Sequence, residues 1–323
     1  AASAGARAHA AHLDWRDAGI DARLAVLQAA GRQLANRRGE LDDGLSGDGL
    51  SSKLARYYGD WIIQCGSPQL LKRYARDVIR RFAVGHGEEL LVRRADGVVL
   101  LVTPSKSPTI NAGALFSILL VGNAVIARAP SNDRGVRFIA DTIIGAALAE
   151  AGFSRDTLQV ITGPTRGVLD ELLPQRDVAT VVFFGNSRAG ADVSRRCAEL
   201  GKKVVLELEG SDHMMVWADA PLGKVMASAS HAFDFSSLPC PIPKHFLVHE
   251  AIFDRFVAGL ARAAVAAAVT IEADRADGNL VPLAHPHQFD SWLQEVLAVG
   301  ELVTGGYRMT AAGARDADGA YAA

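Results

Sequence analysis

The chain has 323 residues, of which 49% are hydrophobic and 22% are charged, and its formal net charge is −2. This length suggests one large domain or two ordinary ones, and the composition is that of a globular protein with a buried core. A charge so close to zero argues against nucleic acid or an anionic membrane surface as a partner.

Cysteine usage and the start of the chain bear on the compartment. The three cysteines show no CxxC spacing, which argues against a disulfide scaffold and a structural zinc site, and we expect no bound metal. The chain has no apolar signal core at its start and no uninterrupted apolar stretch long enough to span a bilayer. We therefore expect a cytoplasmic protein without a membrane partner.

The first part of the chain predicts helices, because apolar residues such as Leu24, Leu27 and Leu34 recur at helical spacing. The pattern changes at Glu89. Two apolar runs, residues 90–94 and 98–102, flank an Ala-Asp-Gly turn. This arrangement predicts a β-hairpin at about residues 88–102.

From residue 98 onward, short apolar runs alternate with helical stretches. Continuous β-branched runs that alternate with helices are typical of a parallel sheet covered on both faces. Ser131 is the expected N-cap of the second helix in this region. The predicted strands are 98–102, 124–127, 158–162, 178–184 and 203–208, and the predicted helices lie near 111–121, 132–150, 165–173 and 187–200.

The remainder of the chain shows a further, shorter β/α pattern. Residues 311–323 are rich in Ala, Gly and Asp and are predicted to form a loop. The sequence therefore predicts an α/β protein with a second, smaller α/β part. In that part, the predicted strands are 214–217 and 246–248, and the predicted helices are 253–268 and 289–299.

Residues 185–190 are a candidate phosphate site, because they follow an apolar strand and open a helix. A helix N-terminus presents unpaired N–H groups and the positive end of the helix dipole, and both favour phosphate. The spacing is neither GxGxxG nor a Walker motif. A plain strand-to-helix turn is therefore an equal interpretation of these residues.

Two further segments carry residues suited to chemistry. Cys240 lies among three prolines in a stiff loop, although a buried, inert thiol is the favoured interpretation of that segment alone. Glu207 and Glu209 end an apolar strand, which is where ligands bind in open α/β sheets. Solvated strand-end acids are an equal interpretation of the two glutamates.

Taken together, these segments resemble the aldehyde dehydrogenase superfamily. Residues 181–187 look like its Phe-x-Gly-Ser segment, residues 206–210 look like its Leu-Glu-Leu-Gly-Gly segment, and the loop of Cys240 looks like its nucleophile loop. Residues 122–126 and 303–306 also match family segments. The resemblance covers nearly the whole chain in the right order, which makes it more specific than any single motif.

The resemblance implies an aldehyde dehydrogenase-like α/β fold. A Rossmann-like parallel-sheet cofactor domain would cover residues 1–209, and a second α/β catalytic domain would cover residues 210–323. The Glu-x-Phe-Gly-Pro segment of the family does not occur, so the catalytic domain is expected to be truncated. The hairpin at about residues 88–102 resembles the family's oligomerisation arm and implies a homodimer or a homotetramer.

The family implies oxidation of a small-molecule aldehyde to a carboxylic acid with NAD or NADP. Cys240 is then the nucleophile and Glu207 the general base. Lys106, or Ser107 under another alignment, stands where the family has an oxyanion-holding asparagine, and we hypothesise that Lys106 replaces it as a charged donor. The implied cofactor contacts are Thr103, Pro104, Ser105, Arg128, Ser131, Gly163, Gly185, Asn186, Ser187 and Leu208.

Departures from the family pattern leave alternatives open. The family's ribose-binding Lys corresponds to Arg128, and its ribose-binding Glu corresponds to Ser131 or Asn132. Loss of that carboxylate with a cation retained would tolerate a 2′-phosphate, so NADP fits at least as well as NAD. A CoA-acylating relative, which passes the acyl group to CoA, is one rival, although Glu207 favours hydrolysis. A catalytically silent cofactor-binding or assembly subunit is the other rival, motivated by Lys106, by Glu209 and by the missing C-terminal part.

Overall fold

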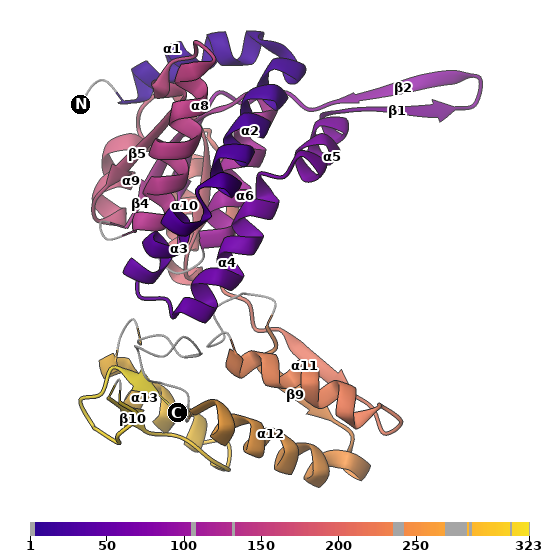
Figure 1. The fold of residues 1–323 in the computed structure, drawn as a ribbon, viewed down its shortest axis with the longest axis vertical. Helices are drawn as coiled ribbons and strands as arrows, with labels where there is room; N and C mark the ends of the chain where they lie inside the picture. The colour runs from indigo at the N-terminus through magenta and orange to yellow at the C-terminus, as the bar shows by residue number, and fades with distance from the viewer. Residues whose placement is uncertain are drawn as a thin grey trace. The chain divides into compact units, whose positions relative to one another are not determined.

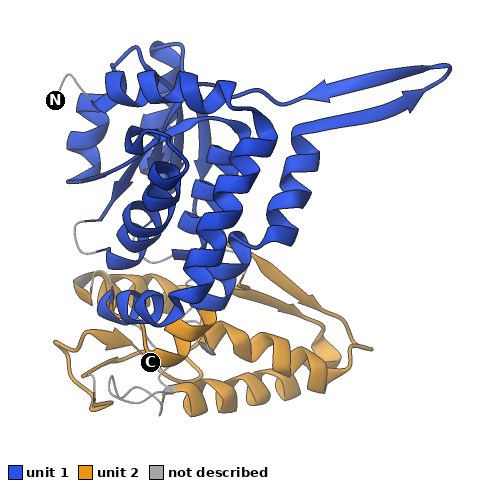
Figure 2. Ribbon diagram, turned by 45° about the horizontal axis from the view of Figure 1, so that its top comes forward, with its two compact units in different colours: residues 1–48, 58–209 blue, residues 49–57, 210–323 orange. Residues whose placement is uncertain are grey.

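The structure is a computed structural model that describes residues 4–104, 108–130, 133–234, 242–268, 283, 286–310 and 312–322. The chain divides into two compact units, which are residues 1–48 with 58–209 and residues 49–57 with 210–323 (Figure 2). The assignment of residues 1–209 to cofactor binding and residues 210–323 to catalysis stays a prediction.

Helices begin the chain, as the apolar spacing predicts. In α2 the buried positions include Val26, Leu27 and Leu34, which lie on one face of the helix. Close packing of α2 also depends on glycine, because a Cβ atom on Gly31 would lie 1.9 Å from the carbonyl oxygen of Gly66. The first helices are α1 (Ala4–Asp17), α2 (Gly19–Asn36), α3 (Arg38–Gly47), α4 (Ser52–Cys65) and α5 (Pro68–Val78).

A hairpin follows the helices, but not where the sequence predicts it. Its strands are β1 (Ile79–Val84) and β2 (Gly87–Val92), which pair antiparallel and extend away from the rest of their unit (Figure 1). The prediction of a hairpin at residues 88–102 is therefore wrong in its bounds. Residues 98–102 are buried on both faces and form a central strand of the parallel sheet instead.

A five-stranded sheet organises the first unit, with the strand order β5-β4-β3-β6-β7 and parallel pairing between all neighbours. This confirms the predicted parallel sheet. Its strands are β3 (Val98–Val102), β4 (Ala124–Ala129), β5 (Leu158–Thr162), β6 (Val178–Phe184) and β7 (Lys203–Glu207).

Helices connect the strands and cover the sheet. One face of β3, made by Val98, Leu100 and Val102, packs in a core with residues from α1, α9 and α10. The connections are α6 (Pro108–Val121), α7 (Arg134–Arg137), the π-helix η1 (Phe138–Ile144), α8 (Gly145–Glu150), the 3-10 helix η2 (Arg155–Thr157), α9 (Thr165–Leu172) and α10 (Ser187–Glu199).

The start of α7 corrects the predicted N-cap. Asp133 caps this helix, because its side chain accepts a hydrogen bond from Val136 N at 2.7 Å. Ser131, the expected cap, lies outside the described residues. Serine and aspartate are both common N-caps, so the choice between them depends on where the extended backbone turns into the helix.

The strand order places a topological switch point between β3 and β6. From β3 the chain runs through α6 to β4 on one side, whereas from β6 it runs through α10 to β7 on the other side. In open α/β sheets, ligands bind outside the carboxyl ends of the strands at such a point. Residues that follow β3 and β6 are therefore placed for ligand binding.

From residue 210 onward, the described part of the second unit has two two-stranded sheets, three α-helices and one 3-10 helix. Its core contains Val216, Ala229, Ile252 and Phe256. The predicted strands and helices are confirmed, but the predicted terminal loop is wrong at its end, because β11 pairs with β10. The elements are β8 (His213–Val216), which pairs parallel with β9 (His245–Val248), then α11 (Leu222–Asp234), η3 (Glu250–Ile252), α12 (Phe253–Ala268), α13 (Pro286–Leu297), β10 (Arg308–Met309) and β11 (Tyr321–Ala322).

Within the described ranges, every helix is too short or too polar to cross a membrane.

Candidate active site

Three of the predicted cofactor residues lie together where β3, β4 and β5 end. Thr103 donates two hydrogen bonds to Arg128 O, from its backbone N at 3.1 Å and from Oγ1 at 2.9 Å. Arg128 in turn donates to Gly163 O from Nε at 3.0 Å and from Nη2 at 2.8 Å. Pro104, the next residue, accepts a hydrogen bond from the Asn111 side chain at 3.4 Å. These bonds tie the carboxyl ends of three neighbouring strands to one another.

Arg128 carries a positive charge at this edge that no carboxylate neutralises within the described ranges. Burial lowers the pKa of its guanidinium, since removal from water disfavours the charged form. Its bonds to the Gly163 carbonyl offset part of that cost but leave the net charge in place. An anionic ligand at the ends of β4 and β5 would therefore find a fixed cation.

The segment after β6 forms the capped start of α10. Asn186 is the N-cap, and its Oδ1 accepts a hydrogen bond from Ala189 N at 2.8 Å. Gly185 N donates to Glu207 O at 3.2 Å, which joins the ends of β6 and β7. Asn186 and Ser187 therefore lie at the carboxyl edge of the sheet, as the sequence predicts.

Glu209 occupies the donors at the start of α10. Its Oε2 accepts hydrogen bonds from Ser187 N at 3.0 Å and from Ser187 Oγ at 3.1 Å. A carboxylate here is favoured by the unpaired N–H groups and by the helix dipole, in the same way that a phosphate would be. The chain's own side chain thus stands where the resemblance places cofactor phosphates.

The other predicted residues near β7 have different roles. Glu207 is the last residue of β7 and is exposed to solvent. Leu208 packs against α10, since a Cβ atom on Gly190 would lie 2.5 Å from its Cδ2. The glycine at residue 190 therefore allows close contact between α10 and the segment that carries Glu207 and Glu209.

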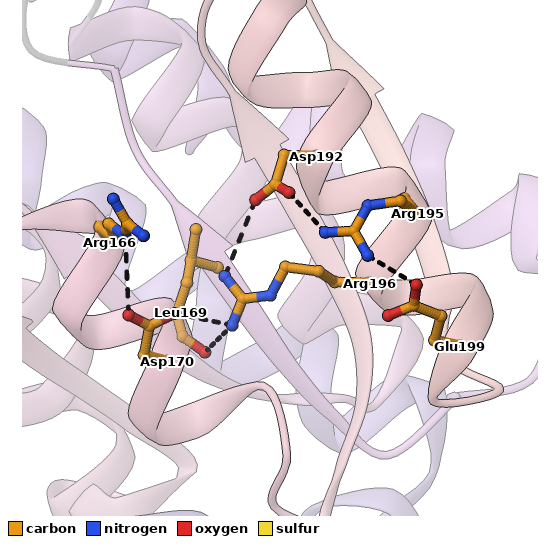
Figure 3. A network of polar contacts seen from close by, with 7 residues as sticks. All are labelled: Arg166, Leu169, Asp170, Asp192, Arg195, Arg196 and Glu199. Atoms are coloured by element: carbon orange, nitrogen blue, oxygen red, sulfur yellow. Dashed lines mark hydrogen bonds and ion pairs between the residues drawn. The ribbon is translucent and has the colours of Figure 1, made fainter.

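A groove of about 830 Å³ lies between α9 and α10. Leu169, Phe183 and Val193 supply apolar surface, and charged side chains line the rest. Figure 3 shows the ion pairs of these side chains, of which Arg196–Asp170 joins α10 to α9 and the others lie within one helix. The lining residues are Thr165, Arg166, Leu169, Asp170, Phe183, Asn186, Arg188, Ala189, Asp192, Val193, Arg195 and Arg196.

Four predicted site residues lie outside the described ranges, namely Ser105, Lys106, Ser131 and Cys240. The predicted oxyanion donor and the predicted nucleophile are both among them. Their placement relative to Glu207 therefore stays a prediction.

The comparisons with known proteins decide the family. The model of the aldehyde dehydrogenase family matches residues 1–322. The chain belongs to this family. It is 30% identical to an alpha-ketoglutarate semialdehyde dehydrogenase of Haloferax volcanii, over 80% of the chain and 54% of that relative. It is 27% identical to a succinate semialdehyde dehydrogenase [NAD(P)+] of Escherichia coli, over 95% of the chain and 66% of that relative.

Solved structures share the fold of this aldehyde dehydrogenase family member. A glyceraldehyde-3-phosphate dehydrogenase of Methanocaldococcus jannaschii complexed with NADP has a TM-score of 0.81 at 23% identity, over 95% of the chain and 68% of that structure. A betaine aldehyde dehydrogenase of Staphylococcus aureus in complex with NAD+ has a TM-score of 0.82 at 20% identity, over 99% of the chain and 64% of that structure. The chain thus spans about half to two thirds of the length of these relatives.

Motif reasoning missed the charged residues of the α9–α10 groove. A signal for them is present, because Arg166 and Asp170 lie four residues apart, as do Asp192 and Arg196. Opposite charges at this spacing usually mark a solvated helix face. Only the packing of α9 beside α10 turns the two faces into the walls of one groove.

Proposed function

We propose that the protein oxidises an aldehyde to a carboxylic acid with NAD or NADP as the hydride acceptor. The observation that carries this proposal is the family match, which extends over both units of the chain. The relatives described above are dehydrogenases of semialdehydes, of betaine aldehyde and of glyceraldehyde 3-phosphate. Those names support an aldehyde as the substrate class without selecting one aldehyde.

The described residues fit an adenine dinucleotide. The α9–α10 groove has the size of a small-molecule site, and its apolar walls suit a base ring. The groove is lined by Asn186, and the N–H and hydroxyl donors of its neighbour Ser187, which now hold the Glu209 carboxylate, would suit phosphate oxygens in its place. Thr103 and Arg128 lie at the ends of β3 and β4, on the other side of the switch point. We propose that these residues hold the cofactor.

The chemistry would be divided among three side chains. The Cys240 thiolate attacks the aldehyde carbonyl and forms a carbon–sulfur bond. Lys106 donates to the oxyanion that results. NAD or NADP, if bound beside this carbon, would supply the hydride acceptor, and loss of the hydride would convert the oxyanion into the carbonyl of a thioester on Cys240. Glu207 then takes a proton from water, which attacks the thioester carbonyl, releases the acid and frees the thiolate.

The test is reduced cofactor formed from a panel of aldehydes with NAD and with NADP. We expect turnover by the wild-type chain and its loss in Cys240→Ala, while that variant still binds the nucleotide. Glu207→Gln should slow release of the acid more than formation of the first equivalent of reduced cofactor, because the base acts in hydrolysis. Acyl-CoA in place of the acid when CoA is added would contradict hydrolysis, and nucleotide binding with no turnover of any aldehyde would contradict catalysis.

We further propose that the protein is a homodimer or a homotetramer, joined through the β1–β2 hairpin. Both strands are exposed along their whole length. A two-stranded hairpin is only marginally stable in water by itself. Its exposed apolar side chains therefore support a role in contact with another copy of the chain.

A further inference from the structure

We propose that His213 and His245, which lie side by side on the sheet of β8 and β9, bind one divalent transition-metal ion such as Zn²⁺ or Ni²⁺. The sheet belongs to the second unit, and neither histidine is among the predicted catalytic or cofactor residues. The inference is independent of the proposed function, because its test measures metal binding and not aldehyde turnover.

The register of the sheet brings the two imidazoles together. His213 is the first residue of β8, His245 is the first residue of β9, and the two are directly paired in the parallel ladder. Their rings stack with centroids 4.8 Å apart and an angle of 19° between the ring planes. This separation is close to the spacing of neighbouring strands, so the backbone holds the pair in place before any ion arrives. The sequence alone predicts no bound metal, because only the pairing of β8 with β9 joins these two residues.

Both rings lie on the face of the sheet that points away from the core of the unit. The next residues along the strands, Met214 and Phe246, pack against that core, and successive side chains of a strand point to opposite faces. His213 and His245 are accordingly exposed. An ion can therefore reach the ring nitrogens from solvent without displacing a packed side chain.

A hydroxyl beside the pair orients one of the rings. Ser211 Oγ lies 3.2 Å from His245 Nδ1, which is within hydrogen-bond distance. In the metal-bound form, Nδ1–H donates to this oxygen and leaves the lone pair of His245 Nε2 free for the ion. Metal-binding histidines usually have such a partner on the other ring nitrogen, because it fixes the tautomer and the ring orientation.

Two imidazole nitrogens select the kind of ion. Imidazole suits Zn²⁺, Ni²⁺ and Cu²⁺, whereas Mg²⁺ and Ca²⁺ prefer oxygen ligands. Metal–nitrogen bonds of about 2 Å place two ligating nitrogens about 3 Å apart, and exposed imidazoles can turn about their side-chain bonds to reach that distance. Among the described residues, no group of three His, Cys, Asp or Glu side chains suits a metal, so water completes the coordination.

The experiment titrates the whole chain with the chlorides of Ni²⁺, Zn²⁺ and Mg²⁺ by calorimetry at about pH 8, where imidazole is in the neutral form that binds metals. We expect the wild type to bind one more equivalent of Ni²⁺ or Zn²⁺ than His213→Gln/His245→Gln, and Mg²⁺ to show no such difference. Either single variant should weaken this equivalent by roughly tenfold or more, because one ring alone loses the chelate. Ni²⁺ should also raise the Tm of the wild type more than that of the double variant, since only the folded chain pairs the two rings.

The double variant tests whether the two rings share one ion. If they do, it should lose little more affinity than either single variant, whereas losses that add would overturn the proposal, because each ring would then bind separately. His86→Gln is the matched control, since His86 is exposed in the turn between β1 and β2 of the first unit, and it should leave the additional equivalent intact.

Ser211→Ala should weaken the additional equivalent less than loss of a ring does. Unchanged affinity in this variant would overturn the role of the hydroxyl. Equal binding of Ni²⁺ and of Zn²⁺ to the wild type and to the double variant would overturn the metal site itself.

Discussion

Glu209 fills the start of α10, where the proposed function places the phosphates of the cofactor. Its carboxylate already accepts the Ser187 N–H and hydroxyl bonds that the proposed function assigns to cofactor phosphates. A diphosphate that approaches Ser187 must displace this carboxylate or lie beside it, and like charges repel at that distance. A substitution of Glu209 therefore tests whether the start of α10 binds an anionic ligand once its own carboxylate is removed.

Glu209→Ala is expected to tighten binding of the adenine dinucleotide by roughly tenfold, or about 1.4 kcal/mol. The measurement is the dissociation constant of NAD and of NADP, with adenosine as a probe that carries no phosphate and should show no change. Glu171→Ala, an exposed position near the other end of α9, is the charge-matched control. Weaker dinucleotide binding in Glu209→Ala would show instead that the carboxylate positions Ser187 for the cofactor.

The turn from strand to helix at this site was predictable from the sequence, whereas the contacts between residues far apart in the chain were not. Asn186 and Ser187 follow an apolar strand and open a helix, which a strand-to-helix pattern predicts. The contact of Ser187 with Glu209 joins residues 22 positions apart, and that of Arg128 with Gly163 joins residues 35 positions apart. Such contacts depend on which strands are neighbours in the sheet. No spacing rule along the chain gives that order.

Two carboxylates lie at the start of α7, of which Asp133 is buried and Asp48 is half-buried, and the charge of the buried one carries a pH-dependent cost. Burial raises the pKa of Asp133 to about 6, with the nearby Asp48 adding to the rise and the hydrogen bond from Val136 N opposing it. Asp48 accepts hydrogen bonds from Arg134 N at 2.7 Å and from Gly135 N at 2.9 Å. Since the folded-state pKa of Asp133 exceeds its value of 3.8 in an unfolded chain, folding favours the protonated form.

Asp133→Asn should therefore raise the free energy of unfolding above about pH 6 and leave it nearly unchanged below about pH 4. The stabilisation from protonated Asp133 is complete below its unfolded-state pKa and is lost as pH rises through the folded-state value. Asparagine keeps the N-cap acceptor without the charge, so the gain should be about 1 to 3 kcal/mol. Denaturant unfolding across this pH range is the measurement, with the exposed Asp43→Asn as control. A gain of equal size at both ends of the range would exclude titration of Asp133 as the cause.

Whether an element could be predicted depended on whether its side chains are buried. The strands at residues 98–102 and 178–184 are continuous apolar runs because both faces of the sheet are covered, and the sequence locates them correctly. In β1, Arg80 and Arg81 interrupt the apolar residues, because neither face of the hairpin packs on the rest of the unit. A prediction rule that looks for one buried face of a strand therefore does not detect β1. It places the hairpin instead on the next apolar run, residues 98–102.

At the scale of the whole molecule, the hairpin exposes apolar side chains on both faces. The strand pairing places Ile79 opposite Val92 on one face, and Arg80 opposite Leu91, next to the pair of Phe82 and Glu89, on the other. Phe82 and Leu91 are each more than two fifths exposed. A hairpin that leaves both faces in water gains little from burial, whereas the same hairpin between two copies of the chain would bury both.

Phe82→Lys/Leu91→Lys is expected to shift the protein from a dimer or tetramer to a monomer at micromolar concentration, because two charges would have to be desolvated in the contact. Sedimentation velocity gives the mass of each species. The control is Leu13→Lys, which adds the same side chain at an exposed apolar position on α1. A wild-type monomer would refute association through any surface. If the double variant forms an oligomer of the same mass as the wild type, the contact between copies lies elsewhere. The exposed faces of β1 and β2 would then need a different partner.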